Sequence, residues 1–465
     1  MTLSPDILQR LNNHPDIERV FSDPEDCYSY GYDNSRRHAL PECVVFPKNT
    51  TGVQAVLQLA AQHQIAVTAR GRATGTPGGS VPLSGGIVLC TLEMNQVLAF
   101  SPADRYITVQ TGILNETVQQ QVSGTNLFWP PDPTSKAYCT IGGNLAYNSA
   151  GPMAVKYGST RDHVLGLVAV TGTGQILKTG VKTTKGVVGY DLTRLLIGSE
   201  GTLGIITEAT LKLTPKPRYQ KTLRLLYPSI QSATAAVCQI MTQAAIPCML
   251  EFMDNHALAL IRQYSGLTIN PNATALLLIE VDGNDAQELT YKIDEICRAA
   301  QTEICLEMLI AEDPMQSKQL WAARKALSPC LRHIAPDKIN EDIVVPISQV
   351  PRLLEELGKL SQNTHIPIVC FGHIGNGNLH VNILYDARTQ TKTAKEILAT
   401  LFHLVLTLGG TLSGEHGVGI DKLPYLGQEL STEVLTMMQG IKQLFDPRGI
   451  LNPFKIGGPL IPPTI

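Results

Sequence analysis

The chain has 465 residues, of which 43% are hydrophobic and 17% are charged, a composition typical of a globular protein with two or three domains. Its 37 basic and 40 acidic residues give a net charge of −3, which excludes nucleic acid or an anionic membrane as a partner held by bulk charge. No apolar run reaches the ~18 residues of a transmembrane helix, and the first residues lack a secretory pattern, so we expect neither a membrane span nor a leader.

The ten cysteines are scattered along the chain, and no two of them form a Cys-x-x-Cys pair. This excludes the usual spacings of iron–sulfur clusters and zinc ribbons. Scattered thiols suit a reducing compartment, so we expect a cytoplasmic protein without an iron–sulfur relay of its own.

The first clear elements form a β-α-β unit. CVVFP at 43–47 and IAVTA at 65–69 predict strands. A helix is expected between them, because apolar residues recur there at helical spacing and Thr51 and Gln54 can form a capping box.

A glycine-rich loop, ARGRATGTPGGSVPLSGG at 69–86, follows the second strand and precedes a third predicted strand, GIVLC. Backbone N–H groups in such a loop can bind phosphate. The loop has neither the Gly-Lys-Ser/Thr of a P-loop nor a GxGxxG sequence, so by itself it is a weak signal.

Two further glycine-rich runs follow. The run at 130–167 has few charges and many small and amide side chains, which suits wrapping a flat polar ligand in hydrogen bonds. The run at 197–217 passes from a glycine loop into an alternating strand and ends at prolines. Between these runs, TGTG at 171–174 predicts a hairpin turn.

Pro215 and Pro217 mark the predicted domain boundary, which divides the chain into residues 1–216 and 217–465. Segments of helical and strand character alternate after this boundary, which indicates an α+β fold. Within them, the apolar segment 401–412 predicts a core helix that ends at a glycine pair.

The most informative stretch is FGHIGNGNLHVNIL at 371–384. LHVNIL predicts a strand, and the alternation of side chains places His380 and Asn382 on the same face. The glycine turn before the strand can adopt positive φ and fold His373 back over that face.

A second stretch, SGEHGVG at 413–419, adds Glu415 and His416. The two stretches together supply two imidazoles, a carboxylate and a spare imidazole. This set suits a divalent metal with an open coordination position and a base beside it, so we predict an enzyme that activates a hydroxyl group or water.

Three glycine loops in this order, a His-x6-His strand, a Glu-His turn and a terminal Asn-Pro-x-Lys sequence together resemble one flavoprotein family. It is the family of vanillyl-alcohol oxidase and p-cresol methylhydroxylase, and within it the D-2-hydroxy-acid dehydrogenase branch. The resemblance covers about residues 40–457. It implies an α+β protein with a two-subdomain FAD-binding domain, 1–216, and an α+β substrate domain, 217–465, whose C-terminal segment returns to the flavin.

The resemblance implies that the first loop binds the FAD pyrophosphate and that the third lies near the adenine end. No histidine occupies the first loop, so we expect the FAD to be non-covalent. The residues that match the family's cofactor pattern are Arg70, Gly71, Thr74, Gly75, Gly78, Gly79, Ser80, Pro131, Asp132, Pro133, Ser135, Gly142, Gly143, Asn144, Gly151, Tyr157, Gly158, Asp162, Glu200, Gly201, Gly204, Ile206, Asn452 and Lys455.

The metal-dependent members of the family bind a divalent metal, often zinc, through two histidines and a glutamate. The resemblance assigns this role to His373, His380 and Glu415, and assigns the role of base to His416.

WAARKALS at 321–328 resembles a substrate-binding segment, with Arg324 as the carboxylate clamp and Ser328 beside it. Without the resemblance, an ordinary helix face explains the segment equally well. Lys338 and Asn382 complete the predicted substrate contacts.

The implied reaction is FAD-dependent oxidation of glycolate or D-lactate to the 2-oxo acid. The hypotheses that remain beside it are a D-2-hydroxyglutarate dehydrogenase, a non-catalytic flavin electron-transfer subunit, and a metal-binding module without flavin. The expected partners are a small 2-hydroxy acid and an iron–sulfur or quinone-linked electron-acceptor subunit. Such a subunit would place a cytoplasmic protein at the periphery of a membrane.

Overall fold

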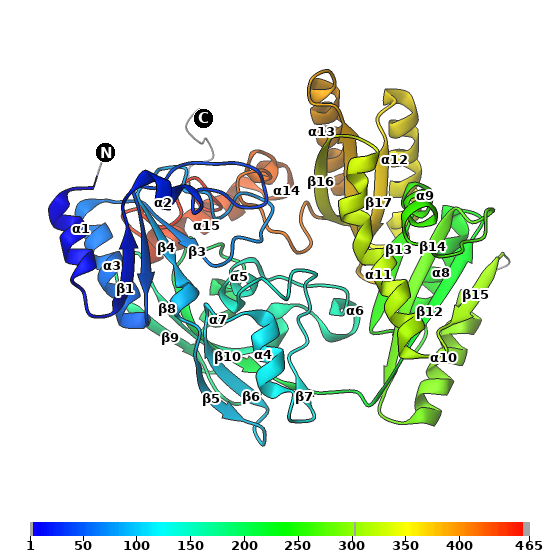
Figure 1. The fold of residues 1–465 in the computed structure, drawn as a ribbon, viewed down its shortest axis with the longest axis horizontal. Helices are drawn as coiled ribbons and strands as arrows, with labels where there is room; N and C mark the ends of the chain where they lie inside the picture. Colours follow the sequence, from blue (N-terminus) through cyan, green and yellow to red (C-terminus); the bar gives the residue numbers. More distant parts are fainter. Residues whose placement is uncertain (1–2, 302–303, 459–465) are drawn as a thin grey trace. The chain divides into compact units, whose positions relative to one another are not determined.

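The computed structural model describes residues 3–301 and 304–458, and the chain divides into two compact units (Figure 1). The first unit is built from residues up to 150, from 158–216 and from 415 onward. The second unit is built from 151–157 and 217–414. Each unit is therefore assembled from segments that are distant in the sequence.

The first sheet of the first unit has the strand order β1-β2-β4-β3, with β2 and β3 both parallel to β4. Every residue of β2 is buried, which is typical of a strand covered on both faces. The strands predicted at 43–47, 65–69 and 86–90 are confirmed as β2, β3 and β4. The bounds are β1 Ile17–Phe21, β2 Cys43–Pro47, β3 Val67–Arg70 and β4 Ile87–Cys90.

The predicted helix is confirmed as α3 (Thr50–His63), which packs on this sheet, but its predicted cap is wrong. Asn49 is the N-cap and accepts a hydrogen bond from the backbone of Gly52 at 3.0 Å. Gln54 does not reach back to the helix start, because its side chain donates to the carbonyl of Gly174 at 2.8 Å. The capping box fails since an asparagine already caps the helix ahead of Thr51.

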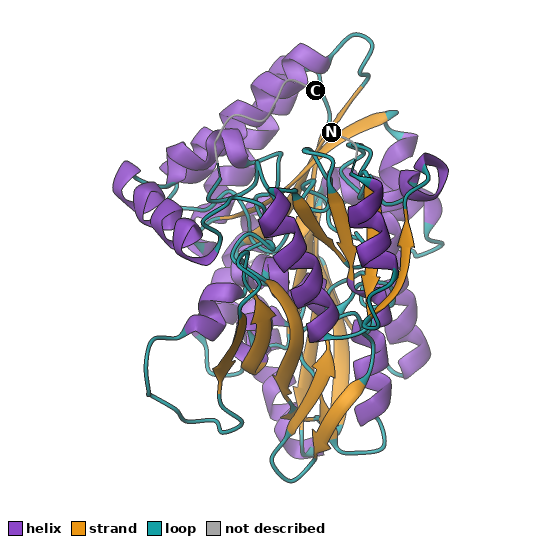
Figure 2. Ribbon diagram, turned by 90° about the vertical axis from the view of Figure 1, so that its left-hand side faces the viewer, coloured by secondary structure: helices purple, strands orange, loops and turns teal. Residues whose placement is uncertain are grey.

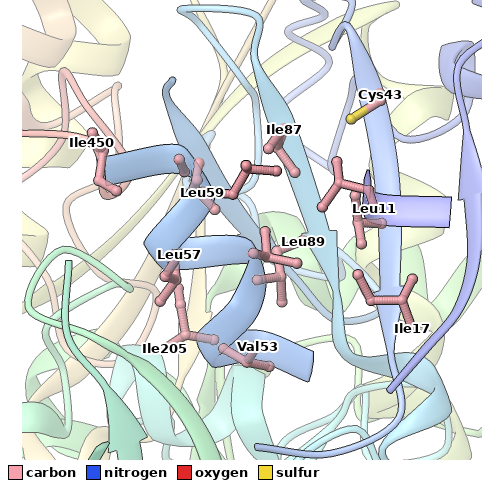
Figure 3. Close-up of a cluster of buried hydrophobic side chains, with 14 of the residues drawn as sticks. Leu11, Ile17, Cys43, Val53, Leu57, Leu59, Ile87, Leu89, Ile205 and Ile450 are labelled. Atoms are coloured by element: carbon pink, nitrogen blue, oxygen red, sulfur yellow. The ribbon is translucent and has the colours of Figure 1, made fainter. Parts of the chain in front are cut away.

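The core of this layer joins α3 to the sheet. Leu57 of α3, Leu89 of β4 and Ile205 lie in one cluster (Figure 3). Each fully buried Leu or Ile contributes roughly 1.5–3 kcal/mol relative to an exposed one. The cluster also contains Ile450 from the C-terminal segment, so that segment is part of the first unit's core.

The second sheet of the first unit is antiparallel, with the strand order β5-β6-β10-β8-β9. β8 and β9 pair across the turn at 171–174, which confirms the predicted hairpin. A short ladder of β7 and β11 lies apart from both sheets. The bounds are β5 Val97–Ser101, β6 Tyr106–Gln110, β7 Leu127–Phe128, β8 Val164–Val170, β9 Ile176–Gly180, β10 Ile205–Lys212 and β11 Thr214–Pro215.

The remaining helices of the first unit lie between these strands in the sequence or in the C-terminal segment of the unit. Their bounds are α1 Pro5–Asn12, α2 Pro24–Tyr28, α4 Asn115–Val122, α5 Ile141–Tyr147, α7 Leu192–Leu196, α14 Leu426–Glu429 and α15 Thr432–Phe445.

The second unit is organised around an antiparallel sheet with the strand order β15-β12-β14-β13-β17-β18-β16. β18 confirms the predicted strand, and its residues Leu379, Val381 and Ile383 are fully buried. The bounds are β12 Tyr219–Tyr227, β13 Met249–Met253, β14 Ala275–Gly283, β15 Glu307–Ile310, β16 Asp337–Val344, β17 Ile368–Gly372 and β18 Asn378–Tyr385.

Two groups of helices pack on this sheet. α9 and α11 share a buried cluster with strand residues such as Leu278 and Phe371. The helices α8, α10, α12 and α13 form another layer against the strands. The bounds are α6 Ala154–Tyr157, α8 Ile230–Thr242, α9 Asn255–Tyr264, α10 Ala286–Ala300, α11 Pro314–Cys330, α12 Val350–Thr364 and α13 Thr391–Thr407.

The helix predicted within 401–412 is confirmed as the end of α13, which stops before Gly409 with its φ of 75°. Helices and strands are mixed throughout the chain, which confirms the α+β class (Figure 2). Among the described residues, no helix has the length and apolar character needed to cross a bilayer.

Candidate functional site

The first unit contains a cavity where its three glycine-rich loops meet. The lining residues come from the end of β3, from α5 and from the loop before β10, and most of them are glycine, alanine or serine. The predicted cofactor residues in the wall are Arg70, Gly71, Gly79, Ser80, Gly142, Gly143, Glu200, Gly201, Gly204 and Ile206.

Asn452 joins two of these loops. Its side-chain nitrogen donates to the carbonyl of Gly79 at 3.0 Å and to the carbonyl of Glu200 at 2.8 Å. Its side-chain oxygen is buried and has no hydrogen-bond partner among the described residues. A buried acceptor without a donor is costly, so a ligand N–H group is one way to satisfy it.

The carboxylate of Glu200 holds the stretch that follows Glu415 and His416. It accepts hydrogen bonds from the backbone N–H groups of Val418 at 2.6 Å and Gly419 at 2.8 Å. Burial raises the pKa of Glu200, and these two N–H groups oppose the increase. The Glu200 side chain therefore fixes the backbone at Val418 and Gly419, within its own unit.

Arg70 and Lys455 also use their charges on backbone carbonyls. The guanidinium of Arg70 donates to the carbonyl of Tyr32 at 2.6 Å and to that of Ser29 at 3.2 Å. The ammonium of Lys455 donates to the carbonyl of Val81 at 2.9 Å, and burial lowers its pKa to about 8 although nearby acids oppose the change. Both side chains thus fix backbone segments of the first unit.

Other predicted cofactor residues lie outside the cavity wall. Asp162 caps a short helical turn by accepting from the backbone of Ser159 at 2.8 Å. Tyr157 belongs to the second unit, where its hydroxyl donates to Asp282 at 2.5 Å. The residues outside the wall are Thr74, Gly75, Gly78, Pro131, Asp132, Pro133, Ser135, Asn144, Gly151, Tyr157, Gly158, Asp162, Asn452 and Lys455.

The sequence prediction missed Thr111 and Tyr147, which line the cavity. A Cβ atom on Gly79 would lie 1.5 Å from the hydroxyl of Tyr147, so this tyrosine and the first loop are in close contact. Tyr147 lies in the polar run at 130–167, where an aromatic residue among small ones was the available signal.

The second unit places a carboxylate, a guanidinium and two imidazoles together. Glu251, in the middle of β13, is 1% exposed. One of its oxygens, Oε2, lies 2.7 Å from both Nε and Nη2 of Arg324 on α11. The other, Oε1, is hydrogen-bonded to Nδ1 of His373. Burial alone would raise the pKa of Glu251, but His373 and Arg324 lower it to about 2.

The two predicted histidine ligands face each other within this unit. The ring centroids of His373 and His380 are 5.2 Å apart and the rings are nearly perpendicular, at 83°. Because Nδ1 of His373 faces Glu251, Nε2 is the nitrogen that would face a metal. The glycine turn does bring His373 back beside the strand, as the sequence suggested.

Glu415 follows Gly414, the last residue of the second unit. The backbone N–H of Gly414 donates to Asp342 at 2.9 Å, so the peptide that carries Glu415 is held at that unit. His373, His380 and Glu415 each offer one ligand atom, and these atoms lie within 4.8 Å of one another. Two imidazoles and a carboxylate are a known zinc-binding set.

The predicted substrate residues divide into two groups. Lys338 on β16 donates to Ser328 at 3.2 Å, one helical turn beyond Arg324. Asn382 is fully buried, and its amide is used within the sheet: it accepts from Asn340 at 2.7 Å and donates to the carbonyl of Val369 at 3.1 Å. Its predicted contact with substrate therefore lacks support from the geometry.

The predicted base, His416, follows Glu415 directly. Nε2 of His416 is 3.9 Å from Oε1 of Glu415, and the His416 side chain is 25% exposed. The imidazole is thus partly accessible to solvent.

Comparisons with known proteins identify two domains in the chain. Residues 41–180 match an FAD binding domain, and residues 216–456 match the C-terminal domain of FAD linked oxidases. The chain is 39% identical over 432 residues to the glycolate oxidase subunit GlcD of Bacillus subtilis (strain 168), covering 92% of this chain and 91% of that protein. It is 34% identical over 430 residues to a D-lactate dehydrogenase of Anaerostipes hadrus, covering 90% of each.

The fold is similar to that of a solved structure, p-cresol methylhydroxylase with substrate bound. The TM-score is 0.79 at 15% identity, and the similarity covers 98% of this chain and 97% of that chain. At this identity the likeness concerns the fold alone, and it agrees with the fold family that the glycine loops suggested.

Proposed function

The chain belongs to the family of FAD-linked oxidases, and on this basis we propose that it oxidises a small D-2-hydroxy acid, glycolate or D-lactate, to the 2-oxo acid. The relatives that carry these activities in their names share about a third or more of their residues with this chain over nine tenths of its length. The proposal adds the substrate, the metal and the base to the family's flavin chemistry.

The first unit fits FAD. The glycines of its cavity wall leave backbone atoms open to a ligand, and the buried acceptor of Asn452 lacks a donor. The carboxylate of Glu200 in the wall is bonded to two backbone N–H groups, which reduces its repulsion of a diphosphate. Bound FAD would supply the acceptor for the hydride equivalent that leaves C2 of the substrate.

The second unit's histidines, together with Glu415, fit a divalent metal such as zinc. The fit rests on the donor types and on the carboxylate behind His373, which is the usual support for a metal-binding imidazole. The metal would lower the pKa of the substrate hydroxyl and orient its C2–H bond.

The chain's own residues perform the remaining steps. Arg324 binds the substrate carboxylate through the guanidinium edge that does not face Glu251. His416 accepts the proton of the substrate hydroxyl as the C2 hydrogen leaves with its electron pair. The products are then the 2-oxo acid, the protonated imidazole and the reduced cofactor, so atoms and electrons balance.

The observation that carries the proposal is the cluster around Glu251. One buried carboxylate bonds to a guanidinium that suits a substrate carboxylate and to an imidazole that suits a metal. A non-catalytic electron-transfer subunit or a metal-binding module without flavin would need only part of this equipment.

D-2-hydroxyglutarate is the second candidate substrate. Its distal carboxylate requires an additional cation. Lys338 is the candidate, because it donates a hydrogen bond to Ser328, which lies one helical turn beyond Arg324 on α11. Reduction of the flavin by D-2-hydroxyglutarate at lower concentrations than glycolate or D-lactate would favour this candidate.

The test is a stopped-flow panel of D- and L-2-hydroxy acids in which flavin absorbance is followed after mixing. D-lactate or glycolate should bleach the flavin, and L-lactate should do so at least tenfold more slowly, because one base and one clamp fix which face of C2 presents its hydrogen. Equal bleaching by both lactate enantiomers would contradict the proposal.

Two further proposals concern the cofactor and the electron acceptor. The FAD should be non-covalent, since no histidine lies in 69–86, and acid precipitation should therefore leave the flavin in the supernatant. Electrons should pass on to an iron–sulfur or quinone-linked partner subunit, in a cytoplasmic complex peripheral to a membrane. Co-purification of the untagged partner with the tagged chain checks this second point.

A further inference from the structure

We propose that Glu251 is a positioning residue that couples the metal ligand His373 to the carboxylate clamp Arg324. The inference rests on the proposed function, because it concerns the metal and substrate of that reaction. It adds that a single buried carboxylate sets the geometry of both, so that metal affinity and substrate affinity change together.

The two oxygens of Glu251 are divided between the two partners. Oε1 bonds to the imidazole of His373, and Oε2 bonds to the guanidinium of Arg324 at 2.7 Å. Glu251 and His373 are 1% and 4% exposed, and the Arg324 side chain is 13% exposed. Water therefore competes little for these hydrogen bonds, and a buried carboxylate of this kind is held firmly by its partners.

The backbone of Glu251 is as fixed as its side chain. It lies in the middle of β13, directly opposite Leu278 of β14 in the antiparallel register. Its neighbours Leu250 and Phe252 are buried. The same strand pairs with β17, which leads to His373, so the carboxylate and the imidazole are attached to adjacent strands.

The carboxylate determines the chemistry of His373. An acceptor at Nδ1 selects the tautomer that carries its proton there, which leaves the lone pair on Nε2 for a metal. A neutral side chain at position 251 would weaken this preference and lower the basicity of the imidazole.

The carboxylate also determines which edge of Arg324 remains for substrate. Glu251 occupies Nε and Nη2 of Arg324, so the edge of the guanidinium that carries Nη1 is left for the substrate carboxylate. Phe371 stacks on the guanidinium, with its centroid 4.7 Å from Cζ, and restrains its rotation. The ring of Phe371 also lies 6.0 Å from that of His380, so Phe371 is a second connection between Arg324 and the histidine pair.

The alternative is that Glu251 only neutralises a buried arginine. Glu307 provides the control, because it pairs with Arg224 in the same sheet and Arg224 is 7% exposed, whereas the Glu307 side chain is 35% exposed. Replacing Glu307 with Gln removes the carboxylate partner of another buried arginine without touching a histidine.

The experiment compares Glu251→Gln, Glu251→Asp and Glu307→Gln in the FAD-loaded protein. Zinc per chain is measured by elemental analysis after dialysis against buffered free zinc. Half-saturation of flavin bleaching is measured with D-lactate and glycolate. FAD content and Tm are measured in all variants to confirm folding.

Glu251→Gln should weaken zinc binding by about 10–100-fold and raise the half-saturating substrate concentration by about tenfold or more. Glu251→Asp keeps the charge but shortens the reach, so it should also weaken both and serves if the Gln variant does not fold. Glu307→Gln should leave both unchanged.

Loss of only one of the two affinities in the Glu251 variants would overturn the coupling, as would loss of neither. A wild-type protein that binds no zinc would refute the metal part of the proposed function and the coupling with it. Wild-type zinc binding that persists unchanged in both Glu251 variants would refute the coupling alone.

Discussion

The two units build their functional regions from different kinds of atoms. In the first, six glycines contribute to the cavity wall, and side chains such as Asn452 and Arg70 hold backbone segments. In the second, the proposed chemistry depends on side chains that share one buried carboxylate, Glu251. The first region should therefore be sensitive to added volume, and the second to altered charge or lost ligands.

The largest effect is expected for a proposed metal ligand of the second unit. His380→Ala should lose the metal, since two protein ligands hold a divalent ion far less well than three, and turnover should fall by about 10³-fold or more. FAD content should not change, because the flavin loops belong to the first unit. Elemental analysis, flavin absorbance and a dye-acceptor assay measure the three quantities.

His403→Ala is the matched control, because His403 is exposed on α13. Full metal content in His380→Ala would show that this histidine is not a ligand.

The next effect tests whether His416 is a base rather than a ligand. His416→Ala should retain metal and FAD while losing about 10²-fold or more in turnover, as expected for a missing general base. Its residual rate should rise with pH, because hydroxide can take the proton in place of the imidazole. Loss of metal in this variant would make His416 a ligand and would refute the proposed division of roles.

A smaller effect is expected for the clamp. Arg324→Lys should raise KM by about 10–100-fold, since the ammonium cannot reproduce the planar fork and the lost hydrogen bonds to a charged group are worth ~1.5–3 kcal/mol. Steady-state kinetics with glycolate and D-lactate measure the change. Wild-type kinetics would indicate that another cation, such as Lys338, binds the carboxylate.

The smallest effect is expected for a glycine in the cavity wall of the first unit. A Cβ atom on Gly71 would lie 2.3 Å from Oγ1 of Thr140, which is 1% exposed and caps α5. Gly71→Ala should therefore cost ~1–3 kcal/mol in packing and weaken FAD binding by about tenfold. The ratio of flavin to protein absorbance after dialysis measures this loss.

Gly124→Ala is the control for that substitution, since nothing lies within 4 Å of the added atom. Equal flavin retention by both variants would show that the cavity wall tolerates an added methyl group. That result would contradict the expectation that the first unit is sensitive to added volume.

Local patterns were sufficient to predict much of the fold. The strands β2 and β18, the β8–β9 hairpin and the end of α13 follow from periodicity and glycine positions within a few residues of each. The cap of α3 was misplaced, because Asn49 caps the helix two residues ahead of Thr51. Gln54 is not part of the cap and bonds to Gly174, a residue 120 positions away that the local pattern does not contain.

The candidate site was predictable where its residues form a motif. His373 and His380 could be paired from the strand and the glycine turn, whereas Glu251 could not, because its partners come from α11 and from the residue that follows β17, far along the chain. The one available signal was a carboxylate within the otherwise apolar strand MLEFM. For Asn382 the predicted strand position is confirmed, whereas its contact with substrate stays a prediction that the use of its amide by the neighbouring strands does not support.

Ribosomal synthesis delivers the parts of the first unit at widely separated times. The backbone of Val67 in β3 bonds to Ile450 and Asn452, and Asn452 also joins Gly79 to Glu200, so the cavity needs residues beyond 449. Between residue 216 and residue 415 the ribosome makes 198 other residues (414 − 216), which takes about 10–40 s at ~5–20 residues per second. We therefore expect nascent chains stalled before residue 450 to retain no FAD, and the cofactor to bind only after the segment that carries Ile450 and Asn452 has been made.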